Sequence, residues 1–162
     1  MKTQFRLAIG LFIILIVAFI ITYLRLWRLS IIIGPYFLHH WFSITGGTYI
    51  LIATTIFSLL KRRTKVNPGA LLKLHVFGNI LALILIFMHI AIQLSRTGDS
   101  APAFGTGLSA LFIFIAISVF GFMTRFGILI RKRESWRLIH IGLALSLLVI
   151  ITIHALRNFD IM

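Results

Sequence analysis

The sequence predicts an all-α fold, a polytopic membrane bundle of about five transmembrane helices. The chain has 162 residues, of which 60% are hydrophobic, and its mean hydropathy is +1.08, which is too apolar for a soluble domain of this length. Apolar runs long enough to cross a hydrocarbon core of about 30 Å occur repeatedly along it. Lipid leaves only helices or a closed barrel to satisfy the backbone. We therefore expect one domain over residues 1–162, with spans at about 7–24, 42–60, 71–93, 107–124 and 137–156.

The first two spans are introduced by characteristic sequences. MKTQFR precedes the first span as the basic region of a signal peptide would, but no small-residue cleavage site follows, so we expect a retained helix. The second span follows GPYFLHHWF, in which Tyr36, Trp41 and Phe42 are typical of a membrane interface.

The remaining spans carry helix signals of their own. Asn67 and Pro68 predict the cap and first turn of the third span, and Ser135 predicts the cap of the fifth. Between the third and fourth spans, the Gly- and Pro-containing sequence SRTGDSAPAFGTG is typical of a flexible connection.

The basic residues predict the orientation of the spans. Twelve of the sixteen Lys and Arg lie in the N-terminus and in the second and fourth loops, and four lie in the alternate segments. The positive-inside rule then places the N-terminus in the cytoplasm and the C-terminus outside, in a plasma membrane, with the third and fifth spans running in the same direction. Because the positive charge lies in these loops, we expect the lipid bilayer, and no nucleic acid, as its partner. The absence of cysteine excludes iron–sulfur clusters and thiolate-ligated haem.

Four histidines form two matched pairs. His75 and His89 lie in the third span and His140 and His154 in the fifth, each pair fourteen residues apart. Fourteen residues are close to four helical turns, so each pair shares one helix face and is separated by about 21 Å. One intramembrane histidine is as readily a helix–helix hydrogen-bonding residue or part of a proton path. Two matched pairs on parallel helices favour two stacked haems, held by His75 with His140 and by His89 with His154.

Several further residues are candidates for a role around the two predicted haems. Gly78 and Gly142 can admit a macrocycle or serve close helix packing. His39 and His40 can lie near the outer haem, bind a metal ion, carry protons, or belong to an interfacial segment. Adjacent residues on a helix point about 100° apart, so we do not expect both to ligate one ion. Four basic residues can pair with haem propionates or snorkel to headgroups: Lys73, Arg96, Arg137 and Arg157.

Residues 40–157 resemble the ferric reductase-like transmembrane domain. This family includes metalloreductases, NADPH oxidases and the haem subunit of the bacterial periplasmic methionine sulfoxide reductase system. The resemblance rests on the fourteen-residue histidine spacing, Thr45-Gly46, Arg131-Lys132-Arg133, the Trp136-Arg137-Leu138-Ile139-His140 sequence and His154.

This resemblance implies transmembrane electron transfer through two b-type haems whose axial ligands are the four paired histidines. The chain has no sixth span and no GxGxxG-like phosphate loop, so no flavin or nicotinamide site is expected. The donor is then a partner protein or a membrane quinol, and the acceptor an external protein or metal ion. Whether the chain reduces a substrate of its own stays open. The alternatives are a ferric or cupric metalloreductase using His39 or His40, a cofactor-free histidine-lined transporter or proton channel, and an anchoring subunit of a redox complex.

Overall fold

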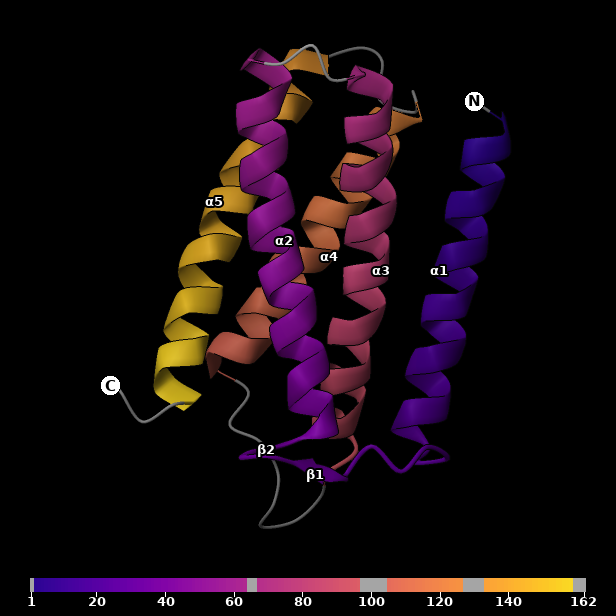
Figure 1. Ribbon diagram of the computed structural model, residues 1–162, viewed down its shortest axis with the longest axis vertical. Helices are drawn as coiled ribbons and strands as arrows, with labels where there is room; N and C mark the ends of the chain where they lie inside the picture. Colours follow the sequence, from indigo (N-terminus) through magenta and orange to yellow (C-terminus); the bar gives the residue numbers. More distant parts are fainter. Residues whose placement is uncertain (1, 64–66, 97–104, 127–132, 159–162) are drawn as a thin grey trace. The chain divides into compact units, whose positions relative to one another are not determined.

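A computed structural model describes residues 2–63, 67–96, 105–126 and 133–158 (Figure 1). It confirms the all-α class, with five helices and one short hairpin in these described ranges. The elements in chain order are α1 (Lys2–Tyr23), β1 (Ile32–Ile33), β2 (Tyr36–Phe37), α2 (Leu38–Arg63), α3 (Pro68–Leu94), α4 (Gly105–Arg125) and α5 (Arg133–Asn158). They fall into two compact units, Lys2–Pro102 and Ala103–Met162.

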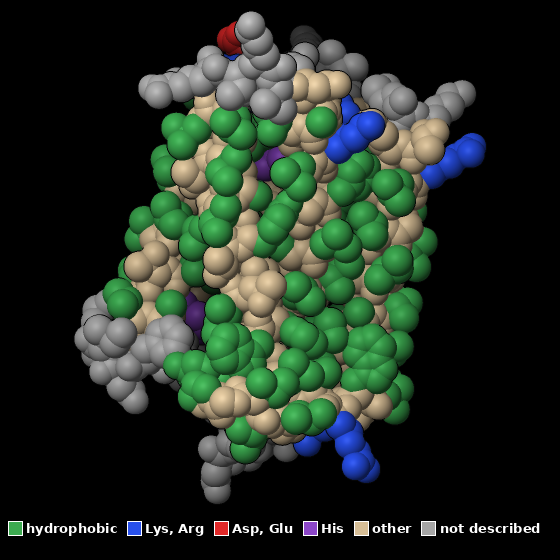
Figure 2. Space-filling model, in the orientation of Figure 1, with side chains coloured by type: hydrophobic (Ala, Val, Ile, Leu, Met, Phe, Trp, Pro, Cys, Tyr) green, Lys and Arg blue, Asp and Glu red, His purple; other side chains and the backbone are tan. Residues whose placement is uncertain are grey.

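The helices identify an integral membrane protein. Four of them are long and apolar enough to cross a membrane: Thr3–Tyr23, Gly69–Leu94, Gly105–Arg125 and Glu134–Arg157. Large apolar side chains such as Ile13 and Ile14 on α1 and Leu145 on α5 are more than half exposed, as lipid-facing residues are. Figure 2 shows hydrophobic side chains covering the sides of the helices and basic side chains near their ends. Within the described residues α2, which covers the expected span 42–60, is not among the four.

In the first unit, α2 and α3 form an antiparallel hairpin, and α1 packs alongside α3. The packing of α2 on α3 depends on small residues. Tyr49 crosses α3 directly over Gly78 and donates a hydrogen bond of 3.0 Å to the Leu74 carbonyl. At Gly46, an added Cβ would lie 2.7 Å from the Ala82 carbonyl oxygen, so the two backbones approach closely there.

This close approach predicts that Gly46→Ala destabilises the protein by about 1–3 kcal/mol, because a backbone carbonyl must move to admit the methyl group. The matched control is Gly47→Ala, since a Cβ at Gly47 meets nothing within 4 Å. That variant should be neutral or more stable by up to about 1 kcal/mol, as alanine is the better helix former. Thermal denaturation of the two detergent-solubilised proteins checks the difference, and equal stabilities would contradict close packing at Gly46.

A two-residue turn closes the β1–β2 hairpin immediately before α2. Gly34 has φ +61°, a conformation that glycine adopts without steric cost, and β1 pairs antiparallel with β2. The Trp41 indole donates a hydrogen bond of 2.8 Å to the Ile33 carbonyl and ties the hairpin to α2. Phe37 ends β2, so α2 begins at Leu38, earlier than the expected span. The early start brings the two adjacent histidines into the first helical turn.

The end of α1 is anchored to the end of α3. Arg25 adopts φ +56°, and the Leu26 amide donates to the Ile21 carbonyl at 3.0 Å, as in a Schellman cap. The Arg25 guanidinium donates to both the hydroxyl and the carbonyl oxygen of Ser95. The ends of these two parallel helices are thereby held together.

In the second unit, α4 packs against α5 in an antiparallel pair. Phe120 stacks on Trp136 with ring centroids 5.2 Å apart, and Phe114 and Leu147 are buried. Of the two helix caps predicted from the sequence, one is confirmed and one is wrong. Asn67 caps α3 by accepting a hydrogen bond from the Gly69 amide, with proline in the first turn, which confirms that prediction.

The predicted cap of α5 is wrong. The helix already includes Arg133 and Glu134, so Ser135 lies inside its first turn. An acidic side chain in the first turn suits the positive end of the helix dipole, which supports the earlier start.

Candidate metal centre

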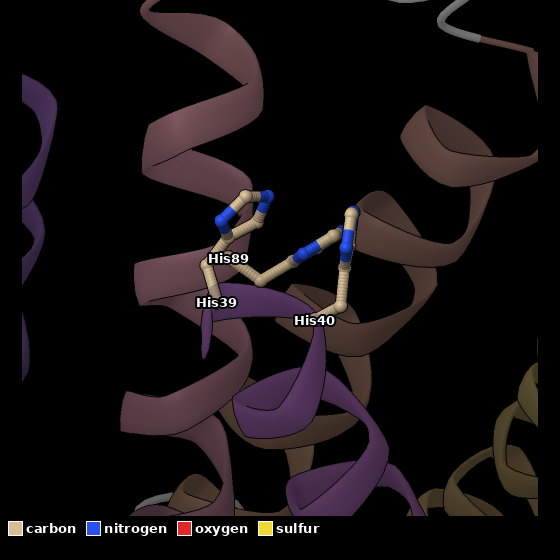
Figure 3. Close-up of side chains that lie close together, drawn as sticks. All are labelled: His39, His40 and His89. Carbon is tan, nitrogen blue, oxygen red and sulfur yellow. The ribbon is translucent and has the colours of Figure 1, made fainter. Parts of the chain in front are cut away.

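Three imidazoles converge at the open end of the α2–α3 hairpin, where α2 begins and α3 ends. His39 and His40 come from the first turn of α2, and His89 comes from α3 (Figure 3). One ligand nitrogen from each ring lies within 4.8 Å of the others. The ring centroids of His39 and His40 are 4.2 Å apart, and those of His39 and His89 are 5.5 Å apart. Three neutral nitrogen donors at this separation are a plausible ligand set for one transition-metal ion.

The cluster is largely removed from solvent. His39 is 1% exposed, and His40 and His89 are half-buried. His39 Nδ1 lies 3.4 Å from the Leu29 carbonyl oxygen, to which it can donate. His39 Nε2 and His40 Nδ1 are buried and have no hydrogen-bond partner in the described part of the chain.

Burial keeps these two imidazoles neutral. His39 and His40 precede the expected span 42–60. Desolvation by burial, and secondarily the electrostatic interaction with His40, lowers the pKa of His39 to about 4, and the hydrogen bond to the Leu29 carbonyl opposes this only in part. Desolvation, followed by Arg96, also lowers the pKa of His40. Both rings therefore carry a lone pair at neutral pH, as metal ligation requires.

A cavity of about 470 Å³ adjoins this cluster and has His39 in its wall. Its other polar lining includes Arg25, Arg28, Ser95 and Arg96. No Asp or Glu occurs between residues 2 and 96, so the guanidinium groups meet no carboxylate of this described segment. The cavity gives small ligands a route to His39, in a positively charged surrounding.

The rings of His39 and His40 lie closer together than a separation of about 100° around the helix suggests, with centroids 4.2 Å apart. Their Cα–Cβ bonds do diverge around the helix, but an imidazole extends several ångströms beyond Cβ and its ring can turn back. The sequence signal for the third member was weak, because His89 lies fifty residues from His39. Only the antiparallel packing of α2 on α3 brings it to the first turn of α2.

The other histidine of α3 lies in a different environment. His75 is half-buried and stacks on Phe57 of α2, with ring centroids 4.6 Å apart. Asn79, one turn later on the same helix, places its amide 3.4 Å from His75 Nδ1. If the amide is turned so that its oxygen faces this nitrogen, it accepts a hydrogen bond from the Nδ1 proton of the ring. The lone pair able to ligate a metal is then on Nε2.

The two histidines of α5 both face α4, each opposite a glycine. An added Cβ at Gly121 would lie 3.1 Å from His140 Cε1, and one at Gly107 would lie 3.1 Å from His154 Cε1. These glycines are fourteen residues apart, like the histidines that they face. Thr106 Oγ1 lies 3.1 Å from His154 Nδ1 and can hold that ring in place. This glycine spacing was a readable signal that the sequence interpretation missed.

The two glycines named in the sequence interpretation have other surroundings. The Tyr49 ring fills the space where a side chain at Gly78 would lie, so Gly78 serves close helix packing. A Cβ on Gly142 would meet nothing within 4 Å. Among the four proposed propionate contacts, Arg96 is half-buried and the others are exposed, namely Lys73, Arg137 and Arg157. Lys73 lies two residues from His75, about 200° around the helix, and so is the least well placed of the four.

The predicted partners His75–His140 and His89–His154 belong to different units, so their pairing remains a prediction. Comparison with known proteins adds no family to this site. No family model, curated protein or solved structure matches the chain. The resemblance to the ferric reductase-like transmembrane domain therefore also remains a prediction.

Proposed function

We propose that this integral membrane protein transfers electrons across the bilayer through two b-type haems. His75 and His140 would hold one iron, and His89 and His154 the other. The observation that carries the proposal is the matched fourteen-residue spacing of two histidine pairs, all four of which are half-buried and face a neighbouring helix of their own unit. Axial ligation needs imidazoles that are turned away from lipid and are held in one orientation.

The residues around the histidines fit axial ligation. Asn79 and Thr106 approach His75 and His154 at Nδ1. A neighbour that accepts a hydrogen bond from Nδ1 would hold each ring in one orientation and leave the lone pair of Nε2 for an iron. Gly107 and Gly121 keep α4 free of side chains beside both α5 ligands. Apolar neighbours such as Phe57 exclude water from the ligand nitrogens. Haem, when bound, supplies a one-electron redox centre, and the protein sets its position and surroundings.

The direction of transfer follows from the predicted topology. With the N-terminus in the cytoplasm, His75 and His140 lie toward the cytoplasmic side and His89 and His154 toward the outside. The donor is a cytoplasmic-side protein or a membrane quinol, and the acceptor is an external protein or metal ion. No residue of the chain is assigned a catalytic role.

The haem content of the purified full-length protein tests the proposal. After expression with ample haem, a pyridine haemochrome assay should find two b-type haems per chain, and the Soret band should shift on reduction with dithionite. A protein that stays colourless under these conditions would contradict the proposal and would favour a histidine-lined transporter or proton channel.

A further inference from the structure

The four-ligand haem scheme does not account for the cluster of His39, His40 and His89, although His89 belongs to both. A metal–nitrogen bond is about 2.0 Å, so two nitrogens bound to one ion lie at most about 4 Å apart. The three ligand atoms already lie within 4.8 Å of one another, and small rotations about χ1 and χ2 close the remaining distance.

Two buried nitrogens of the cluster also favour a bound ligand. His39 Nε2 and His40 Nδ1 are buried and lack a hydrogen-bond partner among the residues that the structure describes. A buried polar atom left in that state is unfavourable for folding, and a bound ion satisfies both nitrogens at once. The Leu29 carbonyl near His39 Nδ1 supplies the outer hydrogen bond that orients a metal-binding imidazole.

Charge determines which ion suits the site. The ligands are three neutral imidazoles, and residues 2–96 contain no carboxylate that could offset an ionic charge. Arg25, Arg28 and Arg96 line the cavity that His39 also lines, so the local potential is positive. Burial of a divalent ion in such surroundings costs more than burial of a monovalent one. Imidazole is a good ligand for copper, and three-coordination is common for its monovalent state.

We propose that His39, His40 and His89 bind one copper ion, as Cu(I), at the end of the α2–α3 hairpin. The adjoining cavity of about 470 Å³, which His39 lines, provides the entry route. The site goes beyond the proposed electron transfer and does not depend on it, because all three ligands belong to one unit.

His89 links the two proposals. One imidazole nitrogen ligates one metal, so copper and the iron of the second haem exclude each other if they use the same nitrogen. Cu(I) binding is therefore measured on full-length protein expressed without added haem, and haem content on protein expressed with ample haem, which keeps a failure of one proposal distinct from a failure of the other.

Competition with a coloured Cu(I) chelator, bicinchoninic acid, tests the site under reducing, anaerobic conditions. The full-length protein should withhold about one equivalent of Cu(I) from the chelator. His40→Ala should weaken this affinity at least about a hundredfold, because one of three ligands is lost. His40 is half-buried, so this variant disturbs packing less than replacement of the fully buried His39.

Two further variants separate ligation from packing. His40→Met supplies a thioether, which is a soft ligand for Cu(I), and should recover most of the affinity that His40→Ala loses. Gln93→Ala, one turn beyond His89 on the same helix, is the matched control and should bind like the parent protein. Far-UV circular dichroism confirms that the variants are folded.

The outcomes are decisive in both directions. One equivalent of Cu(I), lost in His40→Ala and recovered in His40→Met, supports the site, whatever the haem content is. Cu(I) binding that is absent, that is the same in His40→Ala and in Gln93→Ala, or that Zn²⁺ displaces at equal concentration would overturn the proposal.

Discussion

Replacing His75 by alanine should reduce the haem content from two per chain to one, and replacing His140 should remove the same haem. An iron that loses one axial imidazole in a hydrophobic site is held weakly, and b-type haem has no covalent bond to retain it. The pyridine haemochrome assay gives the content. Redox titration of the remaining haem in each single variant identifies which of the two was lost.

Double variants test the proposed pairing, whose members belong to different units. If His75 and His140 hold one haem, the double variant His75→Ala/His140→Ala should keep one haem, like either single variant. His75→Ala/His154→Ala should keep none, because the two replacements then strike different haems. If instead that second combination keeps one haem, the pairing is crossed, and the third and fifth spans do not run in the same direction.

Replacing Gly121 by leucine should remove the haem that His140 is proposed to hold and leave the other in place. A Cβ at Gly121 already lies 3.1 Å from His140 Cε1, so a leucine side chain must displace the imidazole. Gly107→Leu should have the complementary effect through His154, for the same reason. The haem content of each variant should fall to about one per chain.

Gly142→Leu is the matched control on the neighbouring helix α5, because a Cβ there meets nothing within 4 Å. It should keep both haems. Loss of haem in this control as well as in the α4 variants would point to general misfolding and would remove the special role given to Gly107 and Gly121.

Much of the fold was predictable because lipid imposes a simple rule on sequence. A helix that crosses hydrocarbon needs about twenty apolar residues, and the loops of this chain contain no run of that kind. The start of α3 was equally readable, since Asn67 and Pro68 act locally on the first-turn amides. The start of α5 was not readable, because a serine can lie either at the cap or inside the first turn, and Ser135 lies inside it.

The hairpin before α2 went unpredicted, although Gly34 and the proline after it form a recognisable turn signal between apolar residues. The two-residue strands are too short for a periodic pattern to be seen. Their consequence is larger than their size, because they set the first turn of α2 and so the position of His39 and His40.

The sequence by itself determined the class of protein, the number of helices, and the histidine spacing within α3 and within α5. These properties depend on composition and on the fixed rise of a helix, which are local. Only the tertiary structure decided that His89 meets His39 and His40, that Tyr49 fills the space at Gly78, and that Gly107 and Gly121 face the α5 histidines. Those contacts join residues far apart in the chain, and they depend on how each antiparallel helix pair is set in register, which no local pattern encodes.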